Sequence, residues 1–338
     1  MSALPIHHLL VAIEALQAAS VATETVRRAG QGAGGEGLSA ITKSDASPVT
    51  VADFASQAVV LHVLRSALGE VPMLGEESDG LLRDPANAAV LDAVVAAARA
   101  AFPELDARAV LDLLSIERAD PTKEACWTLD PVDGTKGYLR GGQYAIALAW
   151  ISAGRPQMGV MACPRLALDV DDPSLPVESG LLAFAVRGGG ARWTSLDGGE
   201  VDDAAPLRTP TWTPGETVDL LLSAESAHGD GDAAEELGLR AGPIGRAFRL
   251  DSASKYILLA HGRGNAYMRV PRITPGKPER KECVWDHAAG VLIAEEAGCM
   301  TADLDGAPLD FGVGATLANN RGLIAGPPAL VRRIIGPG

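Results

Sequence analysis

The feature that most constrains the fold is a series of short apolar segments, separated by glycine and proline turns, in the middle of the chain. Each segment has the length of one strand, and together they predict an antiparallel meander. Aromatic residues make up only 4% of the sequence, so the core of such a sheet is expected to consist mainly of Ala, Val and Leu. The segments are residues 144–152, 157–163, 180–186 and 190–194.

Helical patterns precede this meander, and a different pattern follows it. Apolar residues at helical spacing predict a helix over residues 6–28, and a glycine-rich stretch at 30–37 predicts a mobile loop that could act as a flap. Residues 86–101 form an alanine-rich helix on propensity. Beyond residue 206, strand and helix patterns alternate, which predicts an α/β layer. The segments are strands at 220–223 and 266–270 and helices at 232–237, 252–261 and 286–297.

The length of 338 residues predicts about two domains, at roughly 150 residues per domain. We place the boundary near residue 207, which gives an N-terminal α+β domain over 1–207 and a C-terminal α/β domain over 208–338. The net charge of −14 argues against nucleic acid or an anionic membrane as a partner. The same charge suits divalent cations.

The four cysteines form no C-x-x-C pair, so we expect a reduced intracellular protein without a zinc cage. The longest clean apolar run, residues 144–151, is far shorter than the roughly 20 residues that span a bilayer. The first 20 residues lack a basic region ahead of their apolar stretch, so they predict a helix of the fold and not a signal peptide. A cytoplasmic location is therefore expected.

The strongest local motif is Asp-Pro-Val-Asp-Gly-Thr at residues 130–135. Asp130 and Asp133 follow an apolar strand and can converge on one divalent cation, with the Val132 carbonyl between them. If Thr135 begins a helical turn, its N–H and that of Gly134 form an anion site beside the cation. An acidic turn that caps a helix is the alternative interpretation of the same residues.

Three other acidic residues occur where a strand or loop ends. Glu76 lies in Gly-Glu-Glu-Ser, Asp286 in Trp-Asp-His-Ala-Ala-Gly, and Asp53 in Pro-Val-Thr-Val-Ala-Asp. Alone, Glu76 could belong to a solvated turn, and Asp286 could be a helix N-cap. Together with Asp130 and Asp133 they predict a shared cleft. The glycines at 188–190 are interpreted as a tight turn, because no G-x-G-x-x-G followed by a helix is present.

With these motifs, the chain resembles the lithium-sensitive, magnesium-dependent phosphatase superfamily of inositol monophosphatase and fructose-1,6-bisphosphatase. D-P-x-D-G-T and W-D-x-A-A-G are shared across that superfamily, and the similarity extends over about residues 40–325. The extension at 136–142 and the stretch Leu-Asp-Ser-Ala-Ser-Lys at 250–255 resemble its 3'(2'),5'-bisphosphate nucleotidase branch. The resemblance implies a layered α/β/α/β/α sandwich with the metal site between an α+β and an α/β domain.

The resemblance also implies roles for the acidic residues. Two or three Mg²⁺ ions would clamp the scissile phosphate and acidify a water molecule. Asp53 and the Thr135 hydroxyl would orient and deprotonate that water, and Glu76 would act both in catalysis and as a metal ligand. The metal ligands would be Glu76, Asp130, the Val132 carbonyl, Asp133 and Asp286.

For the substrate, the resemblance implies that the N–H groups of Gly134 and Thr135 hold the scissile phosphate. The loop at 271–280 is longer and more basic than the branch leads us to expect, so it could alter the nucleotide pocket. Ser252 and Lys255 lie one turn apart on the predicted helix 252–261, for which an exposed helix face is the plain alternative. The residues implied to contact the nucleotide are His228, Ser252, Lys255 and Arg269.

The function implied is magnesium-dependent hydrolysis of 3'-phosphoadenosine 5'-phosphate to AMP and phosphate, inhibited by lithium. Action on 3'-phosphoadenylyl sulfate would connect it to sulfur metabolism and salt tolerance. One alternative is the same chemistry on inositol phosphates or fructose 1,6-bisphosphate, and another is a non-catalytic nucleotide or metal sensor. We expect a monomer whose partner is a small nucleotide bisphosphate, with no nucleic acid or membrane partner.

Overall fold

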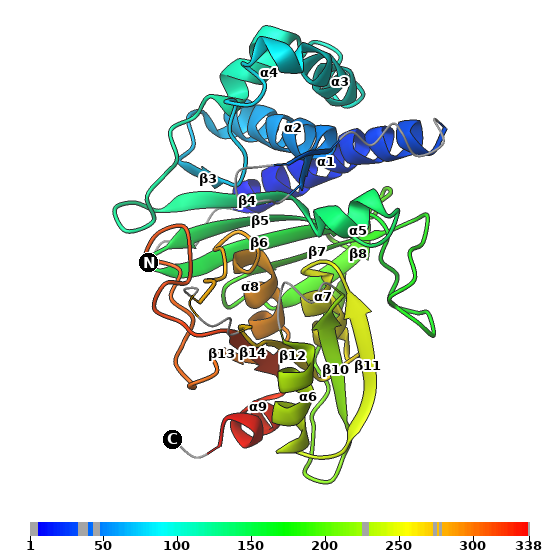
Figure 1. Cartoon of the computed structure of the whole chain (residues 1–338), viewed down its shortest axis with the longest axis vertical. Coiled ribbons are helices and arrows are strands. Elements are labelled where there is room, and N and C mark those ends of the chain that lie inside the picture. Colours follow the sequence, from blue (N-terminus) through cyan, green and yellow to red (C-terminus); the bar gives the residue numbers. More distant parts are fainter. Residues whose placement is uncertain are drawn as a thin grey trace.

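The computed structural model describes residues 6–32, 40–42, 48–224, 230–272, 276 and 279–336. Its helices and sheets form stacked layers (Figure 1). Two helices, α3 (Ala88–Arg99) and α4 (Ala107–Leu114), cover α1 (Ile6–Gly32) and α2 (Val51–Leu68), which lie on a seven-stranded sheet. On the far side of that sheet, α7 (Ser254–His261) and α8 (Ala288–Glu296) separate it from a five-stranded sheet. The other side of the five-stranded sheet carries α6 (Gly231–Leu239) and α9 (Pro328–Ile335). This is the layered sandwich that the resemblance implied.

The larger sheet contains the predicted meander. Its strand order is β3-β4-β5-β6-β7-β8-β9, with β3 and β4 parallel and every later pair antiparallel. The meander prediction is therefore confirmed. The strands are β3 (Met73–Gly75), β4 (Cys126–Asp133), β5 (Ala145–Ser152), β6 (Arg155–Cys163), β7 (Leu181–Val186), β8 (Ala191–Ser195) and β9 (Ala205–Leu207).

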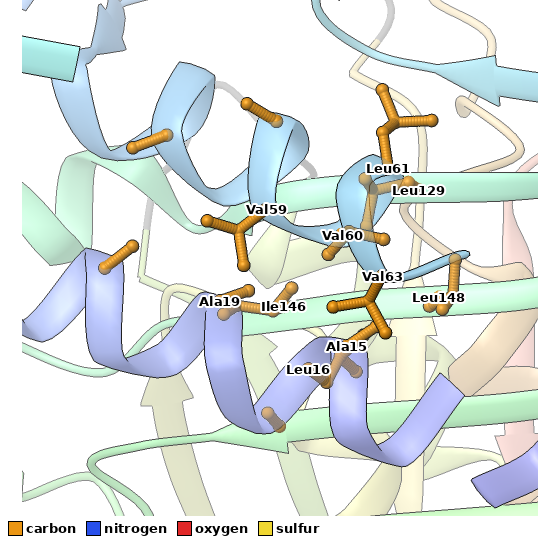
Figure 2. Close-up of a cluster of buried hydrophobic side chains, with 14 of the residues drawn as sticks. Ala15, Leu16, Ala19, Val59, Val60, Leu61, Val63, Leu129, Ile146 and Leu148 are labelled. Carbon is orange, nitrogen blue, oxygen red and sulfur yellow. The ribbon is translucent and has the colours of Figure 1, made fainter. Parts of the chain in front are cut away.

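One face of this sheet is covered by α1 (Ile6–Gly32) and α2 (Val51–Leu68). Ala15, Leu16 and Ala19 of α1 meet the valines of α2 and the sheet residues Ile146 and Leu148 (Figure 2). Small alanines allow this close helix approach, as the composition suggested. Both helices are long and apolar enough to cross a membrane, but 61% and 72% of their apolar windows are buried, as in core helices.

Helix α1 is longer than predicted. Residues 30–32, assigned from sequence to a mobile loop, continue the helix, and residues 33–37 lie outside the described residues. The other elements of the first half are β1 (Ala40–Thr42), β2 (Pro48–Thr50), η1 (Pro85–Asn87), α3 (Ala88–Arg99), α4 (Ala107–Leu114) and α5 (Thr135–Leu139).

The smaller sheet has the order β11-β10-β12-β14-β13. Strand β10 is parallel to β11 and β12, as expected for an α/β layer. Strand β11 was not predicted, because this edge strand is mostly exposed and lacks an apolar pattern. The strands are β10 (Val218–Ser223), β11 (Ile244–Leu250), β12 (Ala266–Arg269), β13 (Met300–Ala302) and β14 (Leu323–Gly326), with outer helices α6 (Gly231–Leu239) and α9 (Pro328–Ile335).

The layer between the sheets consists of α7 (Ser254–His261) and α8 (Ala288–Glu296). The Glu296 carboxylate accepts hydrogen bonds from the N–H groups of Gly188 and Gly190, both at 2.9 Å. The glycine run is thus a turn between β7 and β8, as predicted, and an internal carboxylate occupies its donors. The larger sheet ends at Leu207 and the smaller begins at Val218; division of the chain at residue 207 stays a prediction.

Candidate active site

A bulge in β4 brings Asp130 and Asp133 to one face of the sheet. Asp130 pairs with Ala147 and Asp133 with Ala145, so the two residues between the aspartates of β4 stand opposite one residue of β5. Side chains alternate along a strand, and without the extra residue the two aspartates would point to opposite faces. The Val132 N–H donates to Asp130 Oδ1 at 3.1 Å. The sequence predicts that the strand ends at Asp130 and that Asp133 lies in the loop after it, whereas the strand continues through Asp133.

Glu76 reaches the same place through the neighbouring strand. Strands β3 and β4 are parallel, with Gly75 beside Leu129, and the Glu76 N–H donates to the Leu129 carbonyl at 3.2 Å. Glu76 comes directly after Gly75, and Asp130 comes directly after Leu129, so the two acidic residues lie at the same level of neighbouring strands. The parallel register, and not proximity in sequence, brings these two acidic residues together.

Asp53 lies in the first turn of α2 and is 1% exposed. Its Oδ2 accepts hydrogen bonds from the Thr50 N–H at 2.8 Å and the Thr50 hydroxyl at 2.6 Å, as part of a capping box. One turn later, Gln57 donates to the Glu77 carbonyl at 2.8 Å and accepts from the Glu77 N–H at 3.1 Å. Gln57 thus fastens the Glu76–Glu77 segment to the helix that carries Asp53.

Asp286 reaches the group from the layer between the sheets. It precedes α8, whose N-cap is His287. Asp286 is therefore not a helix N-cap, which was the alternative interpretation of this residue. Beside it, the Arg118 guanidinium lies 5.5 Å from the centre of the Trp285 ring and donates to the Glu76 carbonyl at 2.5 Å. Arg118 therefore connects the chain around Asp286 to the chain around Glu76.

The electrostatics of these carboxylates indicate a cation site. Burial raises the pKa of Asp130 well above its ordinary value, and the negative charges of Glu76, Asp133 and Asp286 raise it further. Burial, followed by Glu77 and Glu76, does the same to the pKa of Asp53. The pKa of Asp286 is raised by burial, then by Asp133 and Glu76. Mutually repelling buried carboxylates need cations to stay ionised, and hard oxygen ligands fit Mg²⁺.

The segment after β4 packs against the loop before α7. Thr135 begins α5, as predicted, with Gly134 as a left-handed N-cap at φ 85°, and the Thr135 hydroxyl donates to the Val132 carbonyl at 3.1 Å. A Cβ on Gly134 would lie 3.1 Å from the Ser252 Cβ, and one on Gly137 only 2.6 Å from the Asp251 Cβ. Gly134 is therefore required by its close approach to Asp251 and Ser252, and Gly137 by its close approach to the Asp251 side chain.

Ser252 and Lys255 are buried, each 1% exposed, so the exposed-face alternative is wrong. Helix α7 begins at Ser254, so Ser252 precedes it and does not share a helix face with Lys255. The Lys255 ammonium donates to the Leu250 carbonyl at 3.0 Å and to the Ser252 carbonyl. Burial lowers the pKa of Lys255 to about 7, and the charge of Asp133 opposes that fall. Lys255 thus lies beside the carboxylate group.

Arg269 ends β12 and lies on a cavity of about 180 Å³. Arg249 and Arg272 also line this cavity, and so do Asp230 and Asp232. Three arginines thus outnumber two carboxylates there, an excess of positive charge that suits an anionic ligand. Arg272 belongs to the basic loop that the sequence singled out. His228 lies outside the described residues, and so do residues 273–275 and 277–278 of that loop.

The structure also shows polar residues near the carboxylate group that sequence reasoning missed. Gln57 and Glu77 are buried beside Asp53, and Arg118 lies over the ring of Trp285, the residue that precedes Asp286. Glu282 contacts both Arg269 and His287, with its Oε2 3.1 Å from His287 Nε2. Only Glu77 had a signal in the sequence, as the second acidic residue of Gly-Glu-Glu-Ser. The other three residues, Gln57, Arg118 and Glu282, belong to no local motif.

Comparison with known proteins identifies the family of the chain. A 3'(2'),5'-bisphosphate nucleotidase of Schizosaccharomyces pombe is 36% identical, covering 88% of this chain and 85% of that protein. A 3',5'-bisphosphate nucleotidase 2 of Arabidopsis thaliana is 35% identical over 83% of each chain. The crystal structure of CysQ from Bacteroides thetaiotaomicron, titled a bacterial member of the inositol monophosphatase family, shows the same fold with a TM-score of 0.60 at 19% identity, covering 94% of this chain and 96% of that one. The model of the inositol monophosphatase family matches residues 8–335, and the chain belongs to that family.

Proposed function

We propose that this protein is a magnesium-dependent 3'(2'),5'-bisphosphate nucleotidase that hydrolyses 3'-phosphoadenosine 5'-phosphate to AMP and phosphate. The observation that supports this most directly is that a group of acidic residues lies next to a group of basic residues. Buried carboxylates from β4, α2 and the start of α8 converge on one side, and Lys255 and Arg269 lie behind them. The curated relatives with this activity support the nucleotide as the substrate class.

The metal ligands would be Glu76, Asp130, the Val132 carbonyl, Asp133 and Asp286. When bound, Mg²⁺ would neutralise the scissile phosphate and acidify the attacking water. Thr50 holds Oδ2 of Asp53, so Oδ1 is the atom that would accept the proton of that water.

The chain's own donors would hold the substrate. The N–H groups of Gly134 and Thr135 would bind oxygens of the scissile phosphate, since Thr135 begins a helix there. Arg269 would bind the non-reacting phosphate through its guanidinium, and Ser252 and Lys255 would border the sugar and that phosphate. His228 stays in this proposal as a nucleotide contact from the sequence alone.

The experiment that tests this proposal is phosphate release with Mg²⁺ from three substrates: 3'-phosphoadenosine 5'-phosphate, inositol 1-phosphate and fructose 1,6-bisphosphate. Each is measured with and without Li⁺. A lithium-sensitive preference for the nucleotide is expected. Preference for either of the other two would retain the metal site but overturn the nucleotide roles of Ser252, Lys255 and Arg269. Metal-dependent binding of the nucleotide without release from any substrate would favour the sensor alternative.

The cysteines bear on the cellular setting. All four cysteines are free thiols, which fits a reducing compartment, and we propose a cytoplasmic monomer. Removal of 3'-phosphoadenosine 5'-phosphate would place the enzyme in sulfur metabolism and salt tolerance. A measurement of molar mass in solution tests the monomer.

A further inference from the structure

Glu282 is a buried carboxylate to which the proposed mechanism assigns no role. Its side chain is 11% exposed and lies between β12, α7 and the segment that carries Asp286. Its Oε2 accepts hydrogen bonds from Arg269 Nε at 3.1 Å and Arg269 Nη2 at 2.6 Å. The same oxygen lies 3.1 Å from His287 Nε2. One carboxylate oxygen of Glu282 therefore contacts two segments of the site, the end of β12 at Arg269 and the start of α8 at His287.

The contact fixes one edge of the Arg269 guanidinium. Within the described part of the chain, the hydrogen bonds of Arg269 leave from Nε and Nη2, and Nη1 donates none. Arg269 also lines the cavity that holds Arg249 and Arg272. A guanidinium held along its Nε–Nη2 edge presents its remaining N–H groups in a fixed direction, which is how an arginine binds a phosphate with two parallel bonds.

Glu282 is itself held in place from the opposite side. His287 is 2% exposed, and its Nδ1 lies 2.9 Å from the hydroxyl of Tyr256 in α7. The Tyr256 ring also contacts α8, since a Cβ on Gly290 would lie 2.1 Å from it. A carboxylate anchored by a histidine that packs between two buried helices has little freedom to move.

We propose that Glu282 is a positioning residue that gives the site its selectivity for substrates with a second, non-reacting phosphate. It acts by orienting Arg269 toward that phosphate and does not touch the reacting atoms. This inference rests on the proposed function, because it assumes that Arg269 faces the non-reacting phosphate.

The sign of the effect separates positioning from simple electrostatics. Glu282 is negative, so its charge alone weakens the attraction of Arg269 for a phosphate. Replacing it by glutamine would then tighten the binding of a doubly phosphorylated nucleotide. Positioning predicts the opposite: Glu282→Gln should weaken that binding by about 10-fold or more, the value of one charge-assisted hydrogen bond. Glu282→Asp keeps the charge but shortens the reach, so positioning predicts weaker binding there too.

The test is calorimetric binding to the full chain with divalent cations chelated, so that the bound nucleotide is not consumed. The ligands are adenosine 3',5'-bisphosphate and adenosine 3'-monophosphate, which differ only in the non-reacting phosphate. We expect both Glu282 variants to lose affinity for the bisphosphate while affinity for the monophosphate changes less than about 3-fold. Glu295→Gln is the matched control, because it removes a glutamate 3.0 Å from Arg187 at the other end of α8.

The outcomes distinguish this inference from the proposed function. Unchanged or tighter bisphosphate binding in the Glu282 variants, or equal loss for both ligands, would overturn the positioning role. A wild-type protein that binds the two ligands equally would instead overturn the assignment of Arg269 to a second phosphate, and with it the proposed substrate. Thermal unfolding of each variant checks that it is folded. If Glu282→Gln does not fold, the binding data for Glu282→Asp alone test the positioning role.

Discussion

Replacing Asp133 by asparagine should stabilise the metal-free protein at neutral pH and abolish phosphate release. Burial raises the pKa of Asp133 from its ordinary 3.8 to about 6, although Lys255, the Ala253 N–H and Arg269 act against the rise. Between these two pH values the folded state holds a proton that the unfolded state has lost. Stability therefore falls as pH rises from about 4 to 6 and remains lower above that range.

The size of the effect follows from the same pKa. The difference between about 6 and 3.8, at about 1.4 kcal/mol per pH unit, corresponds to about 3 kcal/mol at pH 7.5. Asparagine carries no charge to bury. However, its amide replaces a carboxylate that accepted a hydrogen bond from the Ala253 N–H, and the weaker pairing of the amide costs about 1 kcal/mol of stability. Asp133→Asn should therefore be about 2 kcal/mol more stable than the wild type at pH 7.5 without metal.

The assay is urea unfolding followed by circular dichroism at pH 4 and pH 7.5, with chelator and with Mg²⁺. Without metal, wild type should lose about 2.4 kcal/mol more than Asp133→Asn between the two pH values, because about 0.6 kcal/mol of the full effect is already lost at pH 4. Mg²⁺ should stabilise the wild type alone at pH 7.5. Asp172→Asn is the matched control, because hydrogen bonds from Ser174 lower the pKa of this exposed carboxyl, so its pH effect has the opposite sign. Equal pH dependence in wild type and Asp133→Asn, or equal stabilisation of both by Mg²⁺, would refute the reasoning.

Two further substitutions test the water-activating role and the packing of the phosphate segment. Asp53→Asn should lower kcat by about 100-fold or more while the rise in Tm produced by Mg²⁺ is retained; loss of both together would make Asp53 a metal ligand instead. Gly137→Ala places a Cβ 2.6 Å from both the Gln143 carbonyl and the Asp251 Cβ, and should cost about 1–3 kcal/mol in urea unfolding. Gly80→Ala, with open space around it, should cost less than about 0.5 kcal/mol; similar losses in the two would contradict the packing.

The layers of the fold could be predicted because they follow from periodicity in the sequence. Strands β5 to β7 each bury most of their length, and turn residues separate them from one another and from β8, so the meander was visible. Strand β11 was not, because its side chains are mostly exposed and its place at the sheet edge depends only on pairing with β10. The end of α1 was also misplaced, because the helix continues through Gly30 and Gly32, residues that helix propensity alone would exclude.

The acidic residues could be named from sequence, but their arrangement could not. That Asp130 and Asp133 share a face depends on a bulge set by pairing with Ala145 and Ala147, which no spacing within β4 reveals. Lys255 was expected on an exposed helix face or at the ligand, and its burial follows from the position of α7 between two sheets. Glu282 could not be found at all, because its partner Arg269 is 13 residues away and neither belongs to a motif around the other.

Two stretches that the sequence presented as separate signs of a nucleotidase, residues 136–142 and 250–255, prove to be in contact. Gly137 packs on Asp251, and Arg140 donates to the Asp251 carboxylate at 2.7 Å. Part of the first stretch is therefore explained by docking against the second, and not by contact with a nucleotide. Because the Asp251–Ser252 segment leads into the helix that carries Lys255, this docking sets the distance between the phosphate-binding turn at Gly134 and the cationic side of the site. A change in either stretch should then require a compensating change in the other.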